Sequence, residues 1–322
     1  MMNKITLVFL VAFSAAVFSQ DSAAQDRVWA NDQSIEQISE HVYRFGSDNQ
    51  FGAYILTDEG IIVVDGHYCG SGTMAWLKSE LEKRYDVPVK YTILSHDHPD
   101  HSCGSELFND TSTAIASRYL RPHMVFEQRV SAVPEITFED EMDLHLGGVY
   151  LKLMYLGPTH SDNLIQVHIP DEKVLIAIDS AKGKRLFPDY RDMEVNNQLQ
   201  VWKTLASLPD VEIVLPGHGP ITTQQAFLDS RRFVQALKMS VLELMADGRP
   251  LGEIKVRVAA KIIDEFGGEY EPLDTYLESN IVSMYQYLYR YREPNISIKP
   301  LDAIACIEDS TTCRTSSVKP ES

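Results

Sequence analysis

The chain has 322 residues, of which 44% are hydrophobic, so it can bury one large core or two smaller ones. Its 46 acidic and 29 basic residues give a formal net charge of −17 at pH 7. This acidic excess argues against a nucleic-acid partner, because surfaces that bind phosphates are basic.

The N-terminus has the pattern of an export signal. Lys4 precedes an apolar run, Ile5 to Phe18, that is too short to span a bilayer comfortably, and small and polar residues follow it up to Gln25. We interpret residues 1–24 as a cleaved signal peptide, with an uncleaved anchor or a lipidated tail as the alternative. We therefore expect a periplasmic or secreted protein without a stable membrane span after processing.

The next apolar runs predict a β-hairpin and a helix. Residues 51–57 and 60–65 are apolar and are joined by Asp58 and Glu59, which is a hairpin pattern. Residues 71–84 carry apolar side chains at helical spacing.

A dense cluster of possible metal ligands follows the strand-like run Val89 to Leu94. The segment Ser95-His96-Asp97-His98-Pro99-Asp100-His101 holds three imidazoles and two carboxylates. In an extended or loosely turned segment alternate side chains share a side, so His96 and His98 can hold one cation while Asp100 and His101 reach a second. Imidazole combined with carboxylate favours zinc, with iron or manganese as competitors.

Three further candidate ligands occur downstream, each just after a strand-like apolar run. They are His160 in the turn-rich segment 157–163, Asp179 after the run 173–178, and His218 after the run 211–215. Loops at strand ends commonly carry function on a rigid scaffold. The seven residues together predict a metal site with two ions.

Beyond the last ligand the sequence becomes helical. Residues 222–246, 250–265 and 271–292 have helical patterns, separated by Gly248-Arg249-Pro250 and Gly267-Gly268. We divide the chain into a signal peptide (1–24), a catalytic domain (25–225), a helical extension packed on it (226–294) and a polar tail (295–322). A set of tyrosines in the extension could line a substrate entrance or a dimer face, although packing surface is the commoner role: Tyr276, Tyr285, Tyr287, Tyr289 and Tyr291.

In their order and wording these motifs resemble those of the metallo-β-lactamase-fold hydrolases. The resemblance covers about residues 40 to 225 and rests on Val64-Asp65-Gly66, the H-x-H-x-D-H run, a G-P-x-H segment, the strand-ending Asp179 and a P-G-H-G turn. It implies an α/β fold, a four-layer αββα sandwich with two Zn²⁺ ions, or other divalent metals, at one edge.

The resemblance also implies a role for each ligand. His96, His98 and His160 would hold the first metal, Asp100, His101 and His218 the second, and Asp179 would bridge them. Asp100 would also act in catalysis by orienting the attacking hydroxide. Asp65 and Asp97 are candidates to fix the tautomers of the ligating imidazoles.

Two positions indicate the branch of the family. The β-lactamases with a cysteine ligand carry it about where this chain has Asp179 and have Arg in place of His101, so the chain looks closer to the glyoxalase II, lactonase and general hydrolase branches. The G-P-x-H-S segment and Lys182, however, are similar to those lactamases, whose lysine at this offset holds a substrate carboxylate. The resemblance therefore implies substrate contacts for Lys182 and Asn163. Lys182, Lys184 and Arg185 could attract an anionic substrate or simply form a solvated basic loop.

Export and the resemblance bear on the four cysteines. Cys69 and Cys103 fall beside the metal edge in this fold, where they could form a disulfide or leave a thiol facing the substrate. Cys306 and Cys313 are close enough in sequence to close a local loop.

These observations predict a binuclear zinc-dependent hydrolase that cleaves a small ester, lactone, thioester or amide, with β-lactams as a subcase, by a hydroxide that bridges the metals. The alternatives are an iron-dependent redox enzyme on the same fold and a metal-binding protein without catalysis. We expect a small-molecule substrate and no nucleic acid. The sequence leaves the substrate, the physiological metal and the oligomeric state open.

Overall fold

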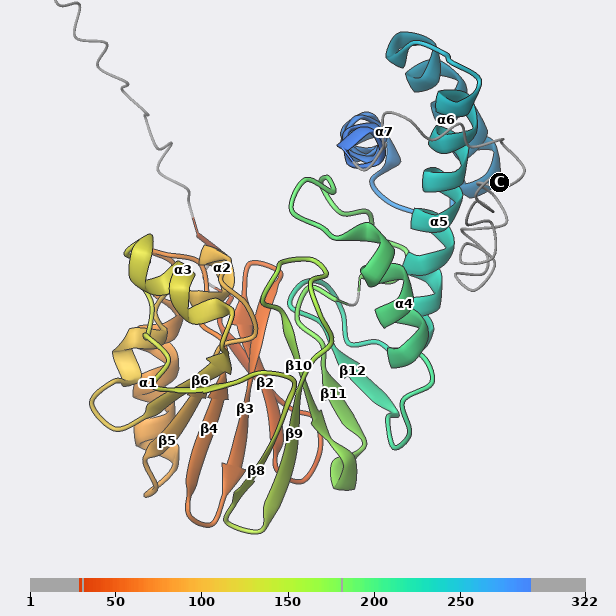
Figure 1. The fold of residues 1–322 in the computed structure, drawn as a ribbon. Coiled ribbons are helices and arrows are strands. Elements are labelled where there is room, and N and C mark those ends of the chain that lie inside the picture. The colour runs from red at the N-terminus through yellow and green to blue at the C-terminus, as the bar shows by residue number, and fades with distance from the viewer. Residues whose placement is uncertain (1–28, 31, 181, 291–322) are drawn as a thin grey trace, which may run out of the picture.

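The computed structural model describes residues 29–30, 32–180 and 182–290, and two β-sheets lie face to face in it (Figure 1). The first sheet has seven strands in chain order: β1 (Ser34–Gln37), β2 (Val42–Ser47), β3 (Gln50–Thr57), β4 (Gly60–Val64), β5 (Val89–Ile93), β6 (Thr113–Ser117) and β7 (Ile136–Phe138). The second has five in the order β12-β11-β10-β9-β8: β8 (Glu141–Leu146), β9 (Val149–Tyr155), β10 (Ile165–Ile169), β11 (Val174–Ile176) and β12 (Ile213–Leu215).

Helices cover the outer faces of both sheets. On the first sheet they are α1 (Thr73–Arg84), the short α2 (Pro99–Ser102) and α3 (Leu120–Phe126); on the second it is α4 (Val195–Leu205), with α5 (Gln225–Ala246) beside it. The helices α6 (Leu251–Phe266) and α7 (Leu273–Arg290) pack on α5 beyond the end of the sheets (Figure 1). Two short 3₁₀ helices span Ser105–Phe108 and Pro170–Glu172. This arrangement is the predicted αββα sandwich with C-terminal helices.

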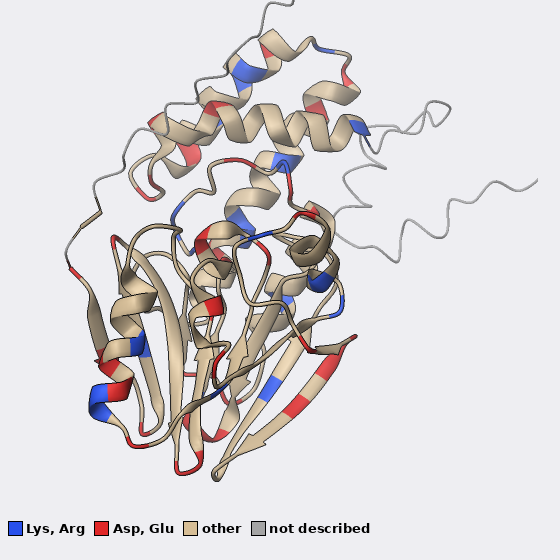
Figure 2. Ribbon diagram, turned by 90° about the vertical axis from the view of Figure 1, so that its left-hand side faces the viewer, with Lys and Arg blue, Asp and Glu red and all other residues tan. Residues whose placement is uncertain are grey.

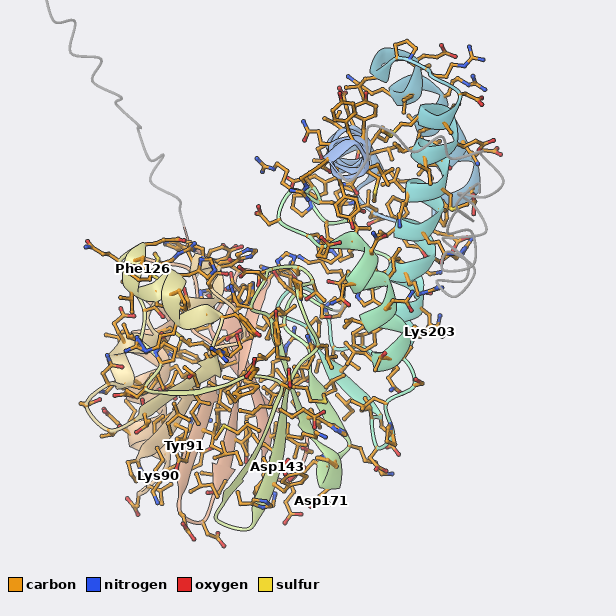
Figure 3. All side chains as sticks on the ribbon, in the orientation of Figure 1. Lys90, Tyr91, Phe126, Asp143, Asp171 and Lys203 are labelled. Carbon is orange, nitrogen blue, oxygen red and sulfur yellow. A yellow bond between two sulfur atoms is a disulfide. The ribbon has the colours of Figure 1, made fainter. Side chains whose placement is uncertain are left out.

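The alternation of side chains along buried strands explains the layering. In β4, Ile62 and Val64 point into the apolar cluster between the sheets, whereas Ile61 and Val63 pack with Leu77 of α1 on the outer face. Successive side chains of a strand point to opposite faces, so a strand buried on both sides must be apolar throughout. Side chains from both sheets fill the space between them, and Tyr91 of β5 lies at its margin (Figure 3).

Strand direction brings the loops that follow the strands to one edge. The predicted hairpin is formed by β3 and β4, and β4, β5 and β6 then run parallel, while β11 and β12 are a parallel pair in the second sheet. The carboxyl ends of parallel strands meet at the same edge of a sheet, which explains why the loops after β4, β5, β11 and β12 are neighbours.

The C-terminal helices share a core with the second sheet. Trp202 of α4, Phe227 of α5 and Met284 of α7 are fully buried in one cluster that also contains Val214 of β12. Among the tyrosines of the extension, Tyr287 is buried in this core, in the packing role that we considered the commoner one. None of the helices in the described ranges is long and apolar enough to cross a membrane. The expected signal peptide, the polar tail, Tyr291 and the Cys306–Cys313 pair lie outside the described residues.

Candidate metal centre

The seven candidate ligands come from four separate loops and meet at the edge shared by the two sheets. Their loops follow β5, lie between β9 and β10, and follow β11 and β12. Two overlapping groups of ligand atoms result, each with all of its atoms within 4.8 Å of one another: His96, His98, His160 and Asp179 in the first, and Asp100, His101, Asp179 and His218 in the second.

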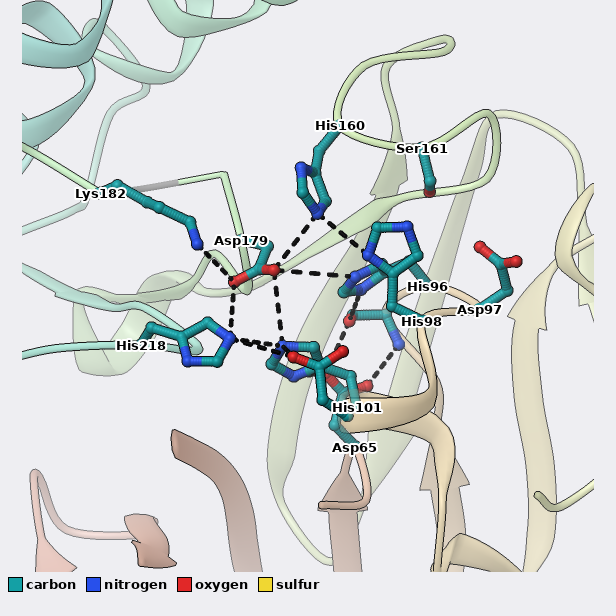
Figure 4. A network of polar contacts seen from close by, with 12 residues as sticks. Asp65, His96, Asp97, His98, His101, His160, Ser161, Asp179, Lys182 and His218 are labelled. Carbon is teal, nitrogen blue, oxygen red and sulfur yellow. Dashed lines mark hydrogen bonds and ion pairs between the residues drawn. The ribbon is translucent and has the colours of Figure 1, made fainter. Parts of the chain in front are cut away.

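Three imidazoles and one carboxylate form the first group. The Nε2 atom of His160 lies 3.1 Å from Nδ1 of His98 and 3.2 Å from Oδ2 of Asp179. Nε2 of His96 lies 4.0 Å from the same carboxylate oxygen. All of these atoms point toward a common centre (Figure 4).

The second group is built on the other side of Asp179. Nε2 of His218 lies 3.2 Å from Oδ2 of Asp100 and 3.6 Å from Oδ1 of Asp179, and it lies 3.3 Å from Nε2 of His101. Asp179 thus presents one carboxylate to both groups, as a bridging ligand would (Figure 4).

These contacts fit metal ligation better than hydrogen bonding. Two pairs of imidazole nitrogens approach each other to 3.1 Å and 3.3 Å. Tetrahedral coordination with Zn–N bonds of about 2.0–2.1 Å places two ligating nitrogens about 3.3 Å apart. Nε2 of His96 and Oδ1 of Asp179 are buried and have no hydrogen-bond partner, although buried polar atoms nearly always have one. A pair of cations would satisfy both atoms.

The protonation states of His96 and Asp179 are also those that metal ligation requires. Burial, reinforced by the neighbouring imidazoles, lowers the pKa of His96 well below its ordinary value and keeps the ring neutral. Burial alone would raise the pKa of Asp179, but Lys182 and His101 hold it well below the usual range. Burial likewise opposes charge on His101, yet the carboxylates of Asp179 and Asp100 raise its pKa well above the ordinary value. A neutral His96 and an ionised Asp179 are the forms that can bind a cation, so the site favours positive charge at its centre.

Asp65 orients the ligand cluster through Ser95, as one of its two expected supports. Asp65 is fully buried at the end of β4 and accepts hydrogen bonds of 2.6 Å from both the backbone N–H and the hydroxyl of Ser95. The Ser95 hydroxyl lies 2.9 Å from Nδ1 of His96, which leaves Nε2 of that ring for the metal. Partners of this kind fix ring orientation and tautomer in metal sites.

Asp97, the other expected support, lies on the far side of the loop. Its carboxylate accepts a hydrogen bond of 2.9 Å from the side chain of Asn163 and lies 3.1 Å from the guanidinium of Arg129. Arg129 also donates to the backbone carbonyl of Asp97 at 2.9 Å. These contacts brace the backbone of the ligand loop and do not reach a ligating imidazole.

The two residues expected to contact substrate are placed differently. Lys182 lines the cleft above the metal centre, and its Nζ lies 3.7 Å from Oδ1 of Asp179. Asn163 is fully buried and does not line the cleft, because its side chain bonds to both the backbone and the carboxylate of Asp97. The structure thus gives Asn163 a place in the support of the ligand loop.

The cleft has a volume of about 400 Å³ and opens over both ligand groups. Its walls come from the loop after β4, with Tyr68, from the segment 182–193, and from Tyr276 of α7. Tyr276 thus lies on the wall of the cleft, which is compatible with a place at a substrate entrance.

A disulfide joins Cys69 to Cys103 across a sequence separation of 34 residues. It links the loop that carries Tyr68 to the end of α2, which carries Asp100 and His101. This resolves the alternative that the sequence left open, because neither cysteine is a free thiol.

Comparisons with known proteins agree with this fold. Residues 52–218, more than half of the chain, match the family model of the metallo-beta-lactamase superfamily, and the chain belongs to that superfamily. A metallo-beta-lactamase type 2 from Elizabethkingia meningoseptica is 24% identical over 204 residues, which cover 60% of this chain and 81% of the relative.

A second relative carries a different name. The alpha subunit of 2,4-dinitroanisole O-demethylase from a Nocardioides strain is 20% identical over 263 residues, which cover 79% of each chain. Among solved structures, a metallo-beta-lactamase from Pontibacter korlensis superimposes with a TM-score of 0.57 at 20% identity and covers 62% of this chain and 98% of its own. At this identity the likeness shows the fold.

Two residues around the metal centre were not predicted from the sequence. Phe187 lies with its ring centroid 5.6 Å from that of His160, and Arg129 braces the ligand loop. Neither occurs in a recognisable motif. A helical apolar spacing did exist for α4, in Val195, Leu199 and Trp202, and would have predicted that element.

Proposed function

We propose that this protein is a binuclear zinc-dependent hydrolase that cleaves a small ester, lactone, thioester or amide, with β-lactams among the candidate substrates. The observation that carries the proposal is the pair of four-residue groups that share Asp179 at the floor of an open cleft. Two bound zinc ions would supply a hydroxide at neutral pH and polarise a carbonyl.

The residues of the chain would prepare the site for this chemistry. Asp179, Asp100 and the five ligating histidines would hold the ions, and the carboxylate of Asp100, 3.2 Å from His218, could also orient the attacking hydroxide. Although burial alone would raise the pKa of Asp100, contacts with His101 and His218 hold it far below its usual range. Asp100 would thus stay ionised throughout the physiological pH range.

Size and charge support a small substrate. A cleft of about 400 Å³ is in the range of pockets for small molecules. Basic side chains are scattered among acidic ones over the described residues, which supports the proposal that nucleic acid is not a partner (Figure 2). Lys182 and Arg185 on the cleft wall favour a substrate with an anionic group. We also propose that the enzyme is exported to the periplasm or secreted, and the disulfide supports this because such bonds are rare in reducing compartments.

An activity panel with metal analysis on the same sample tests the proposal. Zinc-loaded protein should turn over at least one of nitrocefin, a γ-lactone, an acyl thioester and an aryl ester, with close to two zinc ions bound per chain. His98→Ala should bind less zinc and lose turnover by more than about a hundredfold, since loss of a supporting partner alone costs 10–100-fold. His145→Ala, on the exposed face of β8, is the matched control and should behave as wild type.

Two results would contradict the proposal. One is a fully zinc-loaded protein that is inert toward all four substrate classes. The other is purified protein that contains iron with an absorbing cluster, which would favour a redox enzyme built on the same ligands.

A further inference from the structure

Helix α7 lies outside residues 52–218, the part of the chain that matches the superfamily model. It nevertheless reaches the cleft. Besides Tyr276 on the cleft wall, it carries a polar stripe of Ser279, Asn280, Ser283 and Tyr287. Spacings of three and four residues place these side chains on one face of the helix. Asn280, Ser283 and Tyr287 are buried, so the stripe faces protein and not solvent.

The stripe binds the backbone of the segment before α4. Asn280 donates from its amide nitrogen to the carbonyl oxygens of Phe187 at 2.7 Å and Pro188 at 3.1 Å. The hydroxyl of Ser279 also donates to the Pro188 carbonyl. Ser283 accepts a hydrogen bond of 3.0 Å from the N–H of Tyr190.

The contacts continue at both ends of the segment. The hydroxyl of Tyr287 accepts from the N–H of Asn196 at 3.1 Å and donates to the carboxylate of Glu194. Just before α7, the carbonyl of Glu271 accepts from the N–H of Leu186 at 2.8 Å. In Figure 1 this segment is the loop before α4 that extends to α7.

The bound segment is the wall of the cleft and touches the metal centre. Seven of the residues 186–193 line the cleft: Leu186, Phe187, Pro188, Asp189, Arg191, Asp192 and Met193. The Phe187 ring lies 5.6 Å from the ring of His160 and 4.9 Å from Nζ of Lys182. The N–H of Glu194 donates at 2.7 Å to the carbonyl of Thr159, which precedes the ligand His160.

A segment without regular secondary structure must satisfy its backbone groups elsewhere, and here the side chains of α7 do so. Because the side chains of α7 bind backbone atoms of this segment, they fix the course of its backbone independently of the side chains that the segment carries. The geometry of a binding site built on loops is only as precise as the packing and hydrogen bonds of the residues that support those loops.

We infer that α7 determines which ligands the cleft accepts, because its polar stripe holds the wall 186–193 over the metal centre. Asn280 is the central positioning residue, since it binds the carbonyl of Phe187, whose ring lies against His160. The inference rests on the proposed function only in treating the molecules that enter this cleft as substrates.

The test uses Asn280→Asp, which keeps the size of the side chain and replaces the donating nitrogen by an oxygen that repels both carbonyls. Ser283→Ala is a milder second variant. Val258→Ala, in the buried core of α6, is the control for a general loss of stability. All are compared as full-length, zinc-loaded protein.

Two measurements are made on each variant. Hydrogen exchange followed by mass spectrometry reports the protection of residues 186–193. Calorimetry gives the Kd of two thiols that bind zinc: mercaptoacetate, which reaches only the ligand cluster, and 2-benzyl-3-mercaptopropanoate, whose ring extends to the wall. In Asn280→Asp, exchange in 186–193 should accelerate and the benzyl thiol should bind about tenfold more weakly, while mercaptoacetate binds as in wild type. Ser283→Ala should show the same selectivity with a smaller change.

Unchanged exchange in 186–193, or equal weakening of both thiols, would overturn the inference, and so would the same selective loss in Val258→Ala. These readouts do not require turnover. A protein that binds both thiols but hydrolyses no substrate therefore refutes the proposed function and leaves this inference to be judged on the two Kd values.

Discussion

Removing the disulfide should cost this protein a large part of its stability. The bond between Cys69 and Cys103 closes a loop with a sequence separation of 34 residues, which contains α1, β5 and the whole H-x-H-x-D-H run. In the chain-entropy model, a cross-link of this span lowers the entropy of the unfolded chain enough to stabilise the fold by about 3.8 kcal/mol at 25 °C.

Urea unfolding of metal-free protein measures this contribution. Cys69→Ala is the preferred variant because Cys69 is exposed, so that its truncation breaks the cross-link without opening a cavity in the core. With reductant present, its free energy of unfolding should fall by about 3–4 kcal/mol relative to oxidised wild type. Wild type unfolded in the same reductant should match the variant.

The native site should survive the loss. Backbone hydrogen bonds from Gly66 to His101 at 2.5 Å and from His67 to Cys103 at 2.9 Å join the same two segments. Zinc content and turnover at 25 °C should therefore stay near those of wild type. A stability change below about 1 kcal/mol would refute the entropic reasoning, and a loss of zinc at full folding would refute the view that the backbone contacts suffice.

Three further predictions concern the surroundings of the metal centre. Gly66→Ala should reduce both zinc content and melting temperature, because a Cβ at this position would overlap the carbonyl oxygen of Cys103, and normal zinc binding would contradict this. Arg129→Ala should weaken zinc binding about tenfold in a chelator competition, since Arg129 braces the ligand loop through Asp97; an unchanged zinc Kd would show that it does not. Burial lowers the pKa of His67 from 6.5 to about 4, so the unfolded chain takes up the proton first and stability falls as the pH drops from 6.5 to 4. His67→Gln should flatten this part of a plot of melting temperature against pH, and an equally steep plot would place the titration elsewhere.

Much of the fold could be predicted because its signals are local. The apolar runs of β3, β4 and β5 and the helical patterns of α1 and α5–α7 correspond to observed elements, because the period of burial follows directly from backbone geometry. Short elements such as β7, with three residues, are too brief to display a period. Whether such a short segment becomes a strand depends on pairing with another strand that is distant in the sequence.

The candidate site likewise has residues that could be predicted from the sequence and residues that could not. Residue types and strand-end positions indicated His96, His98, Asp100 and His101, because their spacing is set within a single segment of backbone. Asn163 shows the limit of such reasoning. It lies three residues after a ligand, and the family resemblance implied a substrate contact for it, but its side chain turns into the protein toward Asp97.

By itself the sequence determined which donor atoms this protein has and in what order they follow its strands, since both are properties of the chain. Only the tertiary structure decided that Asp179 faces two groups of ligands, that Cys69 meets Cys103, and that the backbone beside Phe187 is held by α7. These pairings join residues from distant segments. They exist because parallel strands of two sheets end at a common edge and because a helix packs beside it, and no local spacing in the chain records either fact.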